Sequence, residues 1–73
     1  MEAKHLTEQE FKKNMEFIVT ALKERGYDPY AQLTGYITEN EPTYITSHKG
    51  ARQLIVTLDI ERVKEYVEDC RNW

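Results

Sequence analysis

The sequence predicts an all-α, single-domain protein made of four compactly packed helices, with an extra short helical turn before the third. Apolar residues recur at the spacing of an amphipathic helix in four separate segments. Residues that cap or end helices separate these segments. A sequence of 73 residues is long enough for one domain but buries only roughly 60% of its unfolded surface, so we expect it to gain stability as a homodimer.

The first helix is predicted over residues 8–25, after a short N-terminal segment of residues 1–7. Thr7 and Glu10 have the spacing of a capping box, in which each side chain accepts the backbone N–H of the other residue. Gly26 can take the left-handed conformation that ends a helix. The buried stripe is expected to contain Phe11, Met15, Ile18 and Leu22, widened by Phe17, Val19 and Ala21.

The second helix is predicted over residues 29–38. Asp28 can cap it, and Pro29 is tolerated at its first position because the N–H that proline lacks has no partner there. Gly35 would cost about 1 kcal/mol in a helix interior, which predicts either a close backbone approach or an early helix end. The inner face is expected to contain Leu33, Tyr36 and Ile37.

The stretch "YITSHKGARQLIVTL", residues 44–58, allows two interpretations. Its threonine, isoleucine and valine content, with a Lys-Gly pair, would suit a hairpin. The spacing of its apolar residues favours a helix over residues 48–58, with Ser47 as a possible N-cap and a short turn at residues 43–45 before it. The spacing that decides for the helix is that of Ala51, Leu54, Ile55 and Leu58.

The last helix is predicted over residues 60–72, with Asp59 as its cap. Its apolar stripe is expected to contain Ile60, Val63, Val67 and Cys70, with Tyr66 and Trp73 beside it.

Composition argues against several classes of function. The net charge is −3 and the basic residues are scattered, whereas nucleic-acid binding needs clustered Lys and Arg to neutralise phosphates. One cysteine cannot form an internal disulfide, and His5 and His48 lack the spacing of a metal site. We therefore expect no metal, no cofactor and no catalysis. Because the sequence has no long apolar segment, we expect no membrane insertion and a cytoplasmic location.

Two stretches carry a resemblance to a known family. They are "ALKERGYDPYAQLTGY", residues 21–36, and "EPTYITSHKGARQLI", residues 41–55. The protein resembles the IreB/ReoM family of small bacterial regulatory phosphoproteins. The matching positions are Gly26-Tyr27, Pro29, Gln32, Gly35-Tyr36, Pro42, Tyr44-Ile45, His48, Ala51-Arg52 and Leu54-Ile55.

The resemblance implies a helical homodimer without enzymatic activity. It also implies an adaptor that a transmembrane Ser/Thr kinase phosphorylates and that controls cell-wall synthesis through regulated proteolysis of an early peptidoglycan enzyme. The implied partners are a second copy of the protein, the kinase, and proteins of proteolysis or cell-wall regulation.

The sequence departs from the family pattern in two places. Relatives have a longer N-terminal tail that holds the phosphorylated threonine, but only "MEAKHL" precedes Thr7 here, so Thr7 is the candidate acceptor. Relatives also carry several arginines on and after the third helix, whereas this protein keeps Arg52. The other positions of that face are Ser47, Val56, Thr57 and Ile60.

The candidate contacts with a protein partner are Arg52, His48 and Lys49, because they can donate charge-assisted hydrogen bonds to an acidic surface. The candidate interface residues are Tyr36, Tyr44 and Val56, because tyrosine and exposed apolar side chains are common in interfaces. Two alternatives stay open. One is a helix-turn-helix-like nucleic-acid binder that uses the third helix, and the other is a phosphate-ligand site in residues 47–52.

Overall fold

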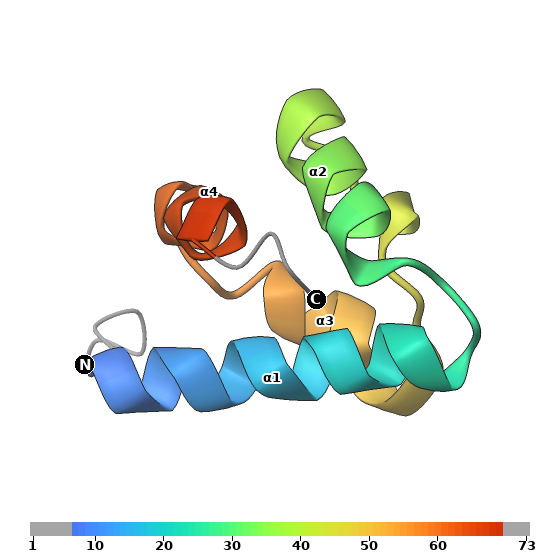
Figure 1. The fold of residues 1–73 in the computed structure, drawn as a ribbon, viewed down its shortest axis with the longest axis horizontal. Coiled ribbons are helices and arrows are strands. Elements are labelled where there is room, and N and C mark those ends of the chain that lie inside the picture. The colour runs from blue at the N-terminus through green and yellow to red at the C-terminus, as the bar shows by residue number, and fades with distance from the viewer. Residues whose placement is uncertain (1–6, 70–73) are drawn as a thin grey trace.

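The computed structural model describes residues 7–69, which form helices and contain no strand. The elements are α1 (Glu8–Glu24), α2 (Pro29–Glu39), the 3₁₀ turns η1 (Pro42–Tyr44) and η2 (His48–Gly50), α3 (Ala51–Ile55) and α4 (Ile60–Asp69). In Figure 1, α1 lies along one edge of the molecule, with α2 and α4 on the same side of it and α3 between them. The predicted all-helical domain of four helices is confirmed, and η1 lies where the extra turn was expected.

The helix ends of α1 and α2 form as their capping residues predict. Thr7 Oγ1 accepts the N–H of Glu10 at 3.1 Å, and the N–H of Thr7 donates to Glu10 Oε1 at 3.0 Å. Gly26, with φ of +83°, lies just past the end of α1. Asp28 Oδ1 accepts the N–H of Tyr30 at 3.1 Å and so caps α2.

The third helix is shorter than the predicted 48–58, because α3 contains only Ala51–Ile55. Ser47 does not cap it through its side chain, and Lys49 and Gly50 both have left-handed backbones, with φ of 57° and 78°, which end the turn η2. An α-helix cannot pass through two left-handed residues, so it starts at Ala51. Beyond α3, Thr57 N donates to Leu54 O at 3.0 Å, which tightens the backbone into a turn.

The last helix starts as predicted, because Asp59 Oδ1 accepts the N–H of Glu61 at 3.0 Å. Its predicted end, including Cys70 and Trp73, lies outside the described residues. α1 ends one residue earlier and α2 one residue later than predicted.

One core contains the apolar faces of all four helices. The predicted residues Met15, Ile18 and Leu22 are fully buried, and Phe17 is the exception because 42% of it is exposed. Phe17 therefore does not widen the buried stripe. The core contains Phe11, Met15, Ile18, Val19, Ala21, Leu22, Leu33, Tyr36, Ile45, Ala51, Ile55, Leu58, Val63 and Val67, with Ile37, Leu54, Ile60 and Tyr66 partly buried against it.

Gly35 lies in α2 where the ring of Tyr44 packs against the helix. A Cβ added at residue 35 would lie 2.6 Å from two ring carbons of Tyr44, which is closer than atoms can approach. The same contact is fixed by Gln32, whose Nε2 donates to the carbonyl of Tyr44 at 2.8 Å. α2 does not end early at Gly35, and the group that comes close to the Gly35 backbone is the side chain of Tyr44, through which η1 docks on α2.

Replacing Gly35 with alanine should destabilise the protein by about 1–2 kcal/mol in urea unfolding. The added methyl must push the Tyr44 ring away, and this overpacking outweighs the gain of about 1 kcal/mol from better helix propensity. In a Tyr44→Ala background the ring is absent, so Gly35→Ala should stabilise instead. If Gly35→Ala stabilises the protein that keeps Tyr44, the Tyr44 ring does not pack against residue 35.

Candidate functional site

The predicted contact residues lie on a turn beside the end of α1, which we call the basic turn and define as residues 48–52. His48 Nε2 lies 2.9 Å from Glu24 Oε1, and Lys49 Nζ lies 3.1 Å from the same oxygen and 3.4 Å from Oε2. One carboxylate of α1 therefore engages two side chains of the turn. The side chains of Glu24, His48 and Lys49 are 41%, 31% and 53% exposed, so all three can contact solvent or another molecule.

The backbone of the basic turn holds these side chains in place. His48 N donates to Thr46 Oγ1 at 3.1 Å, and Gly50 N donates to Ser47 O at 3.0 Å. Lys49 adopts a left-handed backbone, which costs a residue with a Cβ about 1–2 kcal/mol. The rest of the fold must offset this cost.

Arg52 has a structural task that the sequence did not reveal. Its Nε donates to the carbonyl of Ile45 at 2.8 Å, and Ile45 is fully buried. This bond joins α3 to the segment that precedes the basic turn. Arg52 and His48 are both half-buried, whereas Lys49 is exposed. A direct contact of Arg52 with a partner stays a prediction.

The geometry argues against the phosphate-ligand alternative. A phosphate nest needs free backbone N–H groups. In the basic turn, His48 N donates to Thr46 Oγ1, Gly50 N to Ser47 O, and Ala51 N to His48 O. The loop before α3 therefore uses within the protein three of the backbone donors that an anion would need.

The electrostatics of the site centre on Glu24. The pKa of Glu24 is held below its usual value of 4.5. The larger cause is its hydrogen bond with His48, and the second is its hydrogen bond with Lys49. Sequence reasoning missed this residue. One signal was available in the sequence: Glu24 is an acidic side chain in the last turn of α1. Because the helix dipole disfavours negative charge there, a cationic neighbour could have been expected.

The other predicted residues lie apart from the basic turn. Thr7 caps α1. That it accepts phosphate stays a prediction. Tyr36 is only 4% exposed, and burial raises the pKa of its hydroxyl, so it belongs to the core and its role in an interface stays a prediction. Tyr44 and Val56 are 38% and 52% exposed and remain available for an interface.

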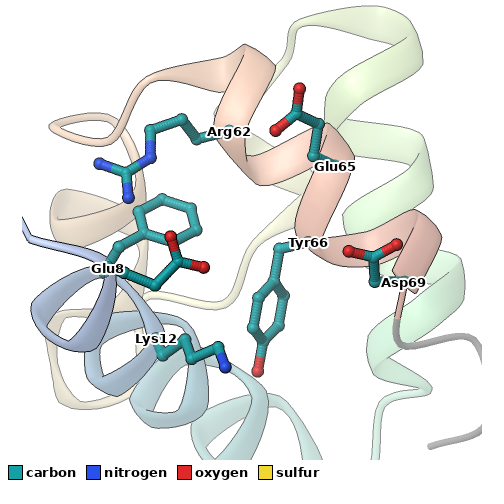
Figure 2. Close-up of a pocket in the computed structure, with 7 residues that line it drawn as sticks. Glu8, Lys12, Arg62, Glu65, Tyr66 and Asp69 are labelled. Carbon is teal, nitrogen blue, oxygen red and sulfur yellow. The ribbon is translucent and has the colours of Figure 1, made fainter.

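A second feature is a surface hollow of about 250 Å³ between α1 and α4, which the sequence did not predict. Phe11 and Tyr66 meet edge to face with ring centres 6.1 Å apart, and the Arg62 guanidinium lies 4.4 Å from the centre of the Phe11 ring. Figure 2 shows Lys12 and the Tyr66 ring extending toward each other from the two helices, with the carboxylate of Glu8 beside them. Glu65 and Asp69 complete the lining.

Two classes of feature are absent from the described part of the protein. Residues 7–69 bring together no three His, Cys, Asp or Glu side chains that could hold a metal ion. None of the helices within this range is long and apolar enough to cross a membrane.

Comparison with known proteins gives two results. The model of the family described as IreB regulatory phosphoprotein matches residues 1–69. A UPF0297 protein from Lachnoclostridium phytofermentans is 41% identical over 51 residues, which is 70% of this chain and 58% of that protein. The aligned part of the sequence thus spans less than two thirds of the length of this relative.

The pKa of Glu24 should rise when either cation is removed. A carbon-13 NMR titration of the side-chain carboxyl should give a midpoint below 4.5 in the wild type, and the midpoint should move upward in His48→Ala and in Lys49→Met. Because the folded pKa is lowered, the stability that this group contributes is present above the unfolded pKa and is lost as the pH falls through the folded one. An unchanged midpoint in both variants would contradict the contacts.

Proposed function

The chain belongs to the IreB family of regulatory phosphoproteins, and we propose that it is a non-enzymatic adaptor that regulates other proteins by binding them. Its resemblance to the family supports a role in controlling cell-wall synthesis, through proteins of regulated proteolysis and in response to a Ser/Thr kinase. This proposal includes a cytoplasmic location, where such partners would be met.

The observation that carries the proposal is the basic turn. His48 and Lys49 already bind a carboxylate, that of Glu24, on the surface of the protein. Their backbone is fixed by internal hydrogen bonds, so little loop entropy remains to be lost on binding. An acidic surface of a partner protein would complement this turn, with Arg52 keeping it in position through Ile45.

The adaptor role can be tested by capture from lysate of the source cell, followed by identification of the proteins by mass spectrometry. Wild type and Lys13→Glu, which changes an exposed charge elsewhere on α1, should recover a protease component or a cell-wall enzyme. Lys49→Glu should lose it, because like charges would then face each other. Equal recovery by all three proteins, or recovery that nuclease abolishes, would refute the adaptor role of the basic turn.

We also propose that the protein forms a homodimer through an exposed apolar residue of α1 and one that directly follows α3. Phe17 and Val56 are 42% and 52% exposed. The turn η2 meets α1 at Glu24, and α3 runs back along α1 from there (Figure 1). Val56 directly follows α3, and α3 packs on α1. A second copy would cover both side chains.

Dimerisation should weaken at least tenfold in Val56→Glu, because a charge would be buried at the interface without a partner. Sedimentation equilibrium would measure the dissociation constant. Tyr27→Glu is the matched control, since Tyr27 is similarly exposed at 48% but lies in the loop between α1 and α2. A dimer that survives Val56→Glu unchanged, or a wild type that is monomeric at high concentration, would exclude this interface.

A further inference from the structure

Glu24 stands where its charge is least favoured on α1. It is the last residue of that helix, where unsatisfied carbonyl groups create negative potential. Its carboxylate nevertheless contacts the side chains of His48 and Lys49 in the basic turn. We propose that Glu24 is an internal competitor, which occupies the carboxylate-binding face of the turn until an acidic segment of a partner protein displaces it. This inference rests on the proposed adaptor function and adds a means of setting its affinity.

The contact geometry is that of a bound carboxylate. Glu24 Oε1 lies within 2.9 Å of His48 Nε2 and 3.1 Å of Lys49 Nζ, and Oε2 lies 3.4 Å from the same ammonium group. Aspartate and glutamate side chains both carry this group, so an acidic segment of a partner could make the same contacts. The place that such a segment would take is therefore defined by the atoms of Glu24.

The contact is also easy to exchange. All three side chains are at least 31% exposed, and exposed ion pairs are weak. Rotation about its own bonds can swing the Glu24 carboxylate into solvent without movement of α1. The backbone of the turn, by contrast, keeps its place, because His48 N and Gly50 N are hydrogen-bonded within the protein. An incoming carboxylate thus meets a loop whose backbone is already arranged.

The charges of these residues also support the displacement of Glu24 by an acidic partner. With Glu24 in place, its negative charge cancels the positive charge of Lys49, and the pair presents no net charge. When Glu24 turns away, Lys49 and the neighbouring Arg52 leave the basic turn positive, which favours an acidic partner over a neutral one. Removing the charge of Glu24 should therefore strengthen binding, which is the opposite of what loss of a purely structural contact would do.

The test compares Glu24→Gln with Glu16→Gln. Both variants remove one negative charge from exposed positions of α1, so they alter the net charge equally. The probe is an acetylated and amidated hexaglutamate peptide, with hexaglutamine as its neutral counterpart, titrated at low salt while the backbone amide signals of residues 48–51 are followed by NMR. Urea unfolding of each variant checks that it is folded.

We expect Glu24→Gln to bind hexaglutamate roughly threefold more tightly than wild type, the gain that losing an exposed internal ion pair allows. Glu16→Gln should bind like wild type, and hexaglutamine should not bind. Lys49→Met should lose the response, while Lys13→Met should keep it. Equal affinities of Glu24→Gln and Glu16→Gln, or signals that do not move in any variant, would overturn the inference.

The outcome is separable from that of the adaptor role. If capture depends on Lys49 but Glu24→Gln does not bind the peptide more tightly, the adaptor stands and Glu24 is only a structural contact. If the peptide series behaves as expected while capture recovers no regulated protein, the competing carboxylate is real and the cellular role proposed above is wrong.

Discussion

The fold depends on burial of one apolar stripe of α1. Met15, Ile18 and Leu22 are completely removed from solvent, and each contributes about 1.5–3 kcal/mol relative to an exposed position. α3 and η2 pack directly on α1, and α2 contacts it as well. Because α3 has only five residues, it could not persist as a free helix. Its place, and therefore that of the basic turn, follows from docking on this stripe.

The parts of the fold that local rules govern could be predicted from the sequence. The cap of α1 by Thr7 and of α2 by Asp28 each involve residues two or three positions apart. The same is true of the helical spacing that identifies most of the core. The start of α3 could not be found in this way, because left-handed backbones at Lys49 and Gly50 interrupt a stretch whose spacing alone is helical. Tertiary docking selects that conformation.

The candidate site was predictable only in part. His48 and Lys49 were identified as surface cations from their residue types and neighbours. Their carboxylate partner lies 24 residues from His48 along the sequence, and no local pattern joins them. Arg52 shows the same limit, since no local pattern predicts the hydrogen bond from its Nε to the carbonyl of Ile45. Contacts between residues far apart in the sequence therefore decide which of these side chains is available to a partner protein.

The packing of Tyr44 on Gly35 also constrains how such a sequence can vary. A glycine inside α2 is tolerated because an aromatic ring from η1 occupies the volume that a side chain would need. Residues 35 and 44 therefore cannot vary independently. A relative that has alanine or serine at the position of Gly35 should also have a smaller residue at the position of Tyr44, or a displaced η1 turn. The coupled pair would serve as a sequence marker of whether the segment after α2 keeps this path.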